Sequence, residues 1–197
     1  MTSEPVNLPV VILAAGLSGR MGTLKPFLKW DNKTTFIEKI IREYIRIGSE
    51  EILVVVNSMV HERLQKDLPQ LYEWARIIVN PEPEKGKFLS LRLGLNELRT
   101  PDYCFIQNID NPFIDEVLLG GMVDLRVSDG YVVPCYHGKT GHPLLAGKLL
   151  IGYIQTLGIK DYNLRLLLNP FRRIFFETEN KRVLVNINSE NDYISAF

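Results

Sequence analysis

The sequence of 197 residues has few cysteines, no excess of charge of either sign and no long hydrophobic run. Its two cysteines, Cys104 and Cys135, fit no metal-binding spacing and each lies in an apolar run, so we interpret both as core thiols rather than as a disulfide. The longest apolar run, Leu8 to Leu17, is too short to span a bilayer. Residues 1–7 carry an acid and no basic cluster, which is not the pattern of a signal peptide. These absences predict a cytoplasmic protein that does not enter a membrane.

The charges balance, with 23 Lys and Arg against 23 Asp and Glu. A balanced chain is not expected to bind nucleic acid or an anionic membrane surface in general, although a local basic site remains possible. Hydrophobic residues make up 46% of the chain and charged residues 23%, which is typical of globular proteins. We therefore expect one domain over residues 1–197, large enough to bury a core without disulfides or metals.

Short apolar segments alternate with segments of helical periodicity along the first part of the chain. The predicted strands are Pro9 to Ala14, Glu51 to Val56, Arg76 to Val79 and Tyr103 to Gln107; the predicted helices are Thr35 to Ile47, Val60 to Leu68 and Phe88 to Leu98. This alternation predicts an α/β fold of three layers, in which helices cover both faces of a mainly parallel sheet. Such sheets bind ligands beyond the carboxyl ends of their strands.

The last third of the chain is less regular. We expect strands at Gly130 to Pro134, Ile174 to Glu177 and Arg182 to Ile187, and helices at Lys148 to Gln155, Tyr162 to Leu168 and Ser189 to Phe197. Ser189 or Asn188 is the expected N-cap of the last helix.

A glycine-rich segment, Leu13 to Lys25 (LAAGLSGRMGTLK), directly follows the first predicted strand. Its glycines allow the backbone to approach a ligand, and Arg20, Lys25 and the nearby Lys29 are not accompanied by any acid. Exposed N–H groups with fixed cations suit a polyphosphate. The spacing matches neither the ATPase P-loop nor the dinucleotide fingerprint. The alternative is a plain strand-to-helix connection with solvated cations.

The pattern L-A-A-G-x-S-x-R-M-G-x-x-K resembles the signature of nucleoside triphosphate transferases. It is most similar to the MobA-like family, and within it to molybdenum cofactor cytidylyltransferases and guanylyltransferases. The resemblance implies a Rossmann-like fold of the nucleotide-diphospho-sugar transferase type, with a nucleotide-binding part at about residues 8–113 and an acceptor part at about 114–197. It also implies nucleotide contacts from the loop residues, with Arg20 and Lys25 acting catalytically on the triphosphate; the loop residues are Leu13, Ala14, Ala15, Gly16, Ser18, Gly19, Arg20 and Lys25. Leu24 stands where guanylyl-transferring relatives often carry Asp, which favours the cytidylyl branch.

A second segment, GKFLSLRLG, opens the helix after the third predicted strand. The family has a small-residue G-x-x-S-S-L pattern here, and this chain retains Gly86 and Ser90 but has Leu89 in place of the first serine. The resemblance implies that Asn80, Gly86 and Ser90 contact the nucleotide. The alternative is a helix N-terminus with ordinary capping.

Two polar positions are expected to hold a divalent cation. Asp110, before Asn-Pro, follows the fourth predicted strand, and oxygen ligands suit Mg²⁺, which keeps several waters of its own. The family's metal-binding acid aligns with Asp110, and its second metal ligand aligns with Asn188, beside Asn186 on the same predicted strand. An asparagine there removes a charge, so we expect weaker metal binding. An Asx-turn role is the alternative for Asp110, while Asp115 is expected to be a helix N-terminal charge.

Gly141-His142-Pro143 is similar to a G-H-P motif of the cytidylyltransferase group. The resemblance implies that His142 faces the acceptor substrate, whereas a structural hydrogen bond is the alternative for a histidine considered alone. His137 and His142 are five residues apart, which suits no zinc site.

Together these motifs predict a Mg²⁺-dependent nucleotidyltransferase that transfers NMP from an NTP, with CTP favoured, to a small phosphorylated acceptor. The resemblance favours molybdopterin as the acceptor. A sugar-1-phosphate or methylerythritol-phosphate acceptor is one alternative. A non-catalytic nucleotide-binding module is the other, because asparagines stand where acids are often found.

Overall fold

A computed structural model describes residues 8–16, 22–99, 101–158, 160 and 162–197. The strands are β1 (Val10–Ala14), β2 (Ile52–Val56), β3 (Arg76–Val79), β4 (Tyr103–Asn108), β5 (Gly130–Tyr136), β6 (Lys139–Thr140), β7 (Leu144–Gly147) and β8 (Arg172–Glu177). The α-helices are α1 (Phe36–Arg46), α2 (Ser58–Asp67), α3 (Leu71–Trp74), α4 (Lys87–Asn96), α5 (Glu116–Asp124), α6 (Lys148–Thr156), α7 (Leu164–Leu167) and α8 (Glu190–Ala196). Short 3-10 helices are η1 (Lys25–Phe27), η2 (Pro83–Lys85) and η3 (Lys181–Leu184).

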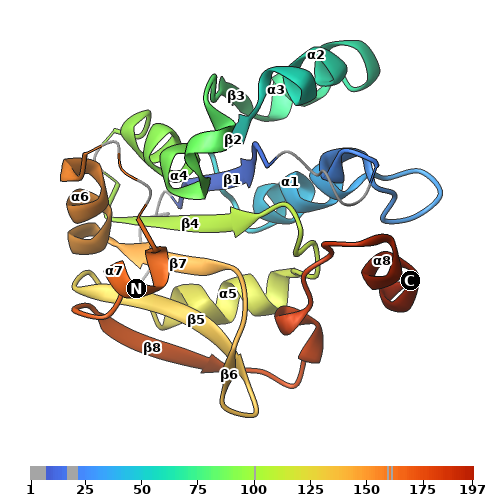
Figure 1. The fold of residues 1–197 in the computed structure, drawn as a ribbon. Coiled ribbons are helices and arrows are strands. Elements are labelled where there is room, and N and C mark those ends of the chain that lie inside the picture. The colour runs from blue at the N-terminus through green and yellow to red at the C-terminus, as the bar shows by residue number, and fades with distance from the viewer. Residues whose placement is uncertain (1–7, 17–21, 100, 159, 161) are drawn as a thin grey trace.

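The strands form one eight-stranded sheet in the order β3-β2-β1-β4-β7-β5-β6, with β8 beside β5 (Figure 1). Strands β1 to β4 are mutually parallel, and β7 is antiparallel to both β4 and β5. Because β8 pairs parallel with β5, both run in the direction of β1 to β4, and only β6 and β7 of the described strands oppose them. The prediction of a mainly parallel α/β sheet is confirmed.

Helices cover both faces of the sheet because successive side chains of each buried strand point to opposite faces. On one face, Val10 and Ile12 of β1 join a core with α1, α2 and α5. On the other, Val11 and Leu13 pack with α4 and α6. All five residues of β1 are buried, as its uninterrupted apolar sequence predicts.

One predicted strand is wrong. Residues 182–187 alternate Val183, Val185 and Ile187, which suggests a strand, but the segment instead forms η3 followed by an irregular stretch. The carbonyl oxygens of Val183 and Val185 accept hydrogen bonds from the side chain of Asn111 rather than from a neighbouring strand. The pattern did not reveal α3, α5, β7 or the two-residue strand β6.

The predicted core thiols and two predicted helix N-termini agree with the structure. Cys104 and Cys135 are both buried and free, and burial raises the pKa of each thiol. Ser189 is the N-cap of α8, and Asp115 is the N-cap of α5. Within the described ranges, no cluster of three metal-binding side chains occurs and no helix is both long and apolar enough to cross a bilayer.

Gly94 sets the distance between α4 and the sheet. A Cβ atom at this position would lie 2.4 Å from Cγ1 of Val11, which is fully buried. We expect Gly94→Ala to lower the free energy of unfolding by about 1–3 kcal/mol, because overpacking outweighs the better helix propensity of alanine. Chemical denaturation measures this change. Gly152 in α6 faces open space, so Gly152→Ala is the matched control and is expected to raise stability by up to about 1 kcal/mol; equal effects of both substitutions would contradict the packing argument.

Candidate functional site

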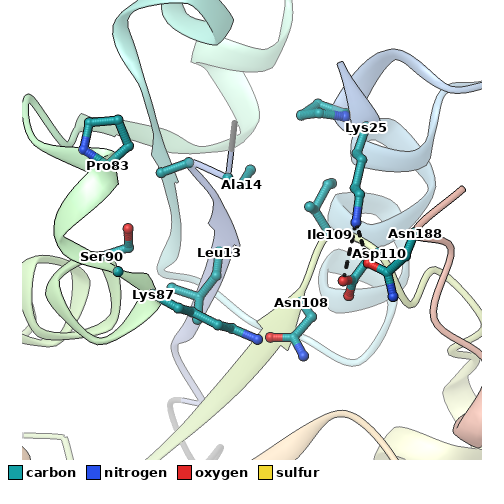
Figure 2. A pocket seen from close by; sticks show the side chains of 14 residues that line it. Leu13, Ala14, Lys25, Pro83, Lys87, Ser90, Asn108, Ile109, Asp110 and Asn188 are labelled. Carbon is teal, nitrogen blue, oxygen red and sulfur yellow. Dashed lines mark hydrogen bonds and ion pairs between the residues drawn. The ribbon is translucent and has the colours of Figure 1, made fainter. Parts of the chain in front are cut away.

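A cavity of about 240 Å³ lies at the carboxyl ends of β1 and β4 (Figure 2). Leu13 and Ala14 at the end of β1 and Asn108 at the end of β4 contribute to its lining. Lys25 from η1 and Asn188, just before α8, approach from the side opposite α4. The cavity therefore occupies the place where parallel sheets bind ligands.

The strand-to-loop connection after β1 is held from behind by Asn57. The Asn57 amide donates to the carbonyl of Ala15 at 3.0 Å, while its carbonyl oxygen caps α2 by accepting from the Val60 amide. Ala15 and Gly16, two of the residues predicted to contact the nucleotide, both line the cavity. Three predicted loop residues, Ser18, Gly19 and Arg20, lie outside the described residues.

The start of α4 forms the opposite wall. Gly86 precedes the helix with a φ of 94°, a conformation that favours glycine, and it lines the cavity together with Ser90. Asn80 does not line the cavity. It is fully buried behind Ser90, and its amide donates to the Ser90 hydroxyl at 2.9 Å. The structure therefore places Asn80 as a support for Ser90.

Lys25, Asp110 and Asn188 form a cluster in which the three side chains point toward one another (Figure 2). The ammonium of Lys25 donates to Oδ1 of Asn188 at 2.7 Å and lies 3.4 Å from Oδ2 of Asp110. The side chains of Lys25 and Asp110 are only 15% and 22% exposed, so their attraction is less screened than at an open surface. The structure thus brings Asp110 and Asn188, the two predicted metal ligands, together with Lys25, which was predicted to bind the triphosphate.

Hydrogen bonds fix how the C-terminal segment meets the end of β4. The Ile187 amide donates to the carbonyl of Asp110 at 2.8 Å. Asp192 of α8 accepts a hydrogen bond from the Asn188 amide at 3.0 Å. Of the two asparagines in this segment, Asn188 reaches the cavity and Asn186 is not among the residues that line it.

The oxygen atoms of this cluster fit a small divalent cation. Oδ1 of Asp110 is buried and accepts no hydrogen bond from any residue that the structure describes. A second oxygen, Oδ1 of Asn188, accepts a hydrogen bond from Lys25, whose ammonium also lies near Oδ2 of Asp110. Two hard oxygen ligands are enough for Mg²⁺, because it retains waters and takes phosphate oxygens from a nucleotide.

His142 lies just behind this cavity rather than in its lining. Its Nε2 is 3.2 Å from Nδ2 of Asn108, which does line the cavity. Burial lowers the pKa of His142 to about 4, with Lys87 adding to the shift and Asp110 opposing it. The imidazole is therefore neutral near pH 7, and its Nε2 accepts the hydrogen bond from Asn108.

The neutral state of His142 predicts a loss of stability in acid. Because the folded pKa lies below the ordinary value, the unfolded chain binds more protons between about pH 6.5 and pH 4, and stability falls as the pH drops through that window. The expected loss from this group is about 2 kcal/mol at pH 5 relative to pH 7. Urea unfolding at both values measures it. In His142→Asn, the difference in the free energy of unfolding between pH 7 and pH 5 should be smaller by that amount. If both proteins showed the same pH dependence, the assignment would be contradicted.

The two polar lining residues that sequence reasoning missed are Lys87 and Asn108. Asn108 ends β4 two residues before Asp110, on the strand that the sequence did predict. Lys87 directly follows Gly86 and is the first residue of α4. The sequence did contain one signal for Lys87: it is a cation at the start of a predicted helix, where acids are favoured, and such a placement is unusual unless the cation has a ligand.

The fold and the cavity define an α/β protein with a ligand-binding site beyond the strand ends of a mainly parallel sheet. A profile of the MobA-like NTP transferase domain matches residues 10–178. The chain therefore belongs to the MobA-like NTP transferase family, which confirms the resemblance, and it is a nucleotidyltransferase.

Individual relatives agree with this assignment. The chain is 29% identical over 189 residues to the molybdenum cofactor cytidylyltransferase of Escherichia coli, covering 94% of this chain and 93% of that protein. It is 26% identical over 144 residues to a probable molybdenum cofactor guanylyltransferase of Clostridium perfringens, covering 72% of this chain and 65% of that protein. The structure of a nucleotidyl transferase from Methanothermobacter has the same fold, with a TM-score of 0.80 at 23% identity, covering 96% of this chain and 95% of that one.

Proposed function

We propose that this protein is a cytoplasmic, Mg²⁺-dependent enzyme that transfers CMP from CTP to a phosphorylated acceptor, the molybdopterin cofactor, and releases pyrophosphate. The observation that carries the proposal is the cluster of Lys25, Asp110 and Asn188 at a cavity that Ala15 and Gly16, just after β1, also line. Its partners are two small molecules, and the balanced charge of the chain agrees with a protein that binds no nucleic acid. We assign nucleotide binding to about residues 8–113 and acceptor binding to about residues 114–197 of a single domain.

The choice of base and acceptor rests on similarity. The relative from Escherichia coli, which is named a molybdenum cofactor cytidylyltransferase, aligns with nearly the full length of both chains. Leu24, in place of an acid before Lys25, favours the cytidylyl branch of the family. His142 supports an acceptor side built by the C-terminal part, because it holds Asn108 at the cavity.

The side chains of this site position and neutralise rather than attack. The acceptor phosphate oxygen attacks the α-phosphorus of the nucleotide, the bond to the pyrophosphate oxygen breaks, and the protein supplies no covalent nucleophile. Lys25 binds the triphosphate and stabilises the charge that grows on the leaving pyrophosphate, and Arg20 is assigned the same role from the resemblance. The walls formed by Ala14, Gly86 and Ser90 orient the nucleotide, which lowers the entropic cost of bringing both substrates together.

Asp110 and Asn188 would hold Mg²⁺, which when bound neutralises phosphate charge and polarises the α-phosphate. In the protein without nucleotide, the ammonium of Lys25 balances the charge of Asp110. Lys25 would exchange this carboxylate partner for phosphate oxygens when the nucleotide binds.

The test is pyrophosphate release with Mg²⁺, using CTP, GTP, UTP and ATP against molybdopterin, a sugar-1-phosphate and methylerythritol phosphate. We expect release with CTP and molybdopterin. Release with another base or acceptor would retain the nucleotidyltransferase and correct its substrates. Tight NTP binding without release from any pair would instead favour the non-catalytic nucleotide-binding module.

A further inference from the structure

Lys87 is a cation of the cavity that the proposed mechanism does not use. It lines the cavity from α4, on the wall opposite Lys25, and its side chain points toward Asn108 (Figure 2). Lys87 is exposed to solvent, so a ligand in the cavity can reach it. No carboxylate or carbonyl group of the described part of the chain forms an ion pair or hydrogen bond with its ammonium.

The position of Lys87 is electrostatically unfavourable in the free protein. It is the first residue of a ten-residue helix, where the helix dipole disfavours a cation, and Gly86 provides no side-chain cap. Desolvation by the surrounding protein atoms lowers the pKa of Lys87, Asp110 opposes that shift, and the like charge of Lys25 adds to it. An anion bound between the two lysines would relieve both the repulsion and the unpaired charge.

The neighbours of Lys87 identify where such an anion would lie. Asp110 and Lys25 belong to the cluster on one side, and on the other side the charge of Lys87 acts on His142. Asn108 links the two sides, because it lines the cavity and bonds to His142. His142 is neutral and so does not compete with an anion for the ammonium.

Resting on the proposed function, we infer that Lys87 binds a phosphate oxygen at the end of the cavity beside Asn108, where the reacting phosphates of the two substrates meet. The phosphate belongs either to the α-position of the nucleotide or to the acceptor, and both offer the same anionic oxygen to an ammonium. Lys87 is then a catalytic residue that touches substrate.

The test compares Lys87→Met with Lys85→Met. Lys85 is two residues away, exposed and ion-paired with Glu82, and it does not line the cavity. One arm measures the dissociation constant of CTP by calorimetry without acceptor. The other arm measures the KM for molybdopterin and kcat by pyrophosphate release. Thermal melting of each free protein accompanies both arms.

We expect Lys87→Met to raise the dissociation constant of CTP or the KM for molybdopterin at least tenfold, while Lys85→Met changes none of the three measured parameters by more than twofold. Weaker CTP binding assigns the contact to the nucleotide. An unchanged CTP affinity with a raised KM for molybdopterin assigns it to the acceptor. The melting temperature of the free Lys87→Met protein should stay the same or rise, because an unfavourable charge is removed, and Lys87→Arg should recover part of the lost binding.

The inference is overturned if Lys87→Met leaves both arms within twofold of the wild type, or if Lys85→Met has an equal effect. If the wild-type protein binds CTP but releases no pyrophosphate, the proposed function fails and the CTP arm alone decides on Lys87. In that case a tenfold loss of CTP affinity still supports the contact, and an unchanged affinity rejects it.

Discussion

Replacement of Asp110 by asparagine is expected to lower kcat at least a hundredfold. Asp110 is the only acid among the described residues that line the cavity, and its Oδ1 atom is buried without a hydrogen-bond partner in that part of the chain. Asparagine keeps the shape and one oxygen but removes the charge that would attract Mg²⁺. A hundredfold loss corresponds to about 2.7 kcal/mol of barrier. Pyrophosphate release over a range of Mg²⁺ concentrations measures the loss, and the half-saturating concentration of Mg²⁺ should rise.

Asp115→Asn is the matched control for this substitution. Asp115 caps α5 by accepting a hydrogen bond from the Leu118 amide at 2.8 Å, and it does not line the cavity. Asparagine caps a helix about as well as aspartate does, so neither turnover nor the requirement for Mg²⁺ should change. A wild-type rate in Asp110→Asn would remove Asp110 from the metal site.

The parts of the fold that the sequence predicts are those in which burial alone dictates the pattern. Strands β1 and β2 read VVILA and ILVVV because both faces of a central parallel strand are covered. The position of Asp110 follows from the same logic, since a polar residue directly after such a strand must lie at the ligand-binding edge. Its pairing with Asn188 depended on the family resemblance, because the two residues are far apart in the chain.

The errors arise where tertiary contacts override a local pattern. Residues 182–187 alternate like a strand, yet the Val183 carbonyl accepts hydrogen bonds from the amide of His142 and from the side chain of Asn111. No local feature of the sequence indicates those partners. Asn80 depends on tertiary structure in the same way: the family resemblance implied a nucleotide contact, while in the structure its amide donates to the Ser90 hydroxyl and its side chain does not line the cavity.

Lys87 shows why a lysine in a helix is difficult to interpret from sequence. Most helical lysines extend into solvent, and the periodicity of α4 marks only its apolar face. Whether the side chain at the first position points into the cavity depends on how α4 packs against β1 and β2. That packing is set in part by Gly94, whose missing side chain allows the close approach to Val11.

Substitution of Lys25 by methionine should also lower kcat at least a hundredfold, with a different signature. Because we assign Lys25 to the triphosphate, the variant should bind CTP at least tenfold more weakly even without Mg²⁺, whereas Asp110→Asn should not weaken metal-free binding. Calorimetry with and without Mg²⁺ separates the two cases. Lys29→Met is the matched control, because Lys29 is exposed, lies four residues away and does not line the cavity. Metal-free CTP binding at wild-type affinity would contradict the role of Lys25.

The double variant Lys25→Met/Asp110→Asn tests whether the two residues act at one site. Lys25→Met leaves the mostly buried carboxylate of Asp110 in place, and Asp110→Asn leaves the mostly buried ammonium of Lys25. The double variant removes both charges together. Residues in direct contact do not contribute additively. The loss of kcat in the double variant should therefore be smaller than the product of the two single losses. A fully multiplicative loss would show that the cluster seen in the free protein is not the unit that binds the reacting phosphates.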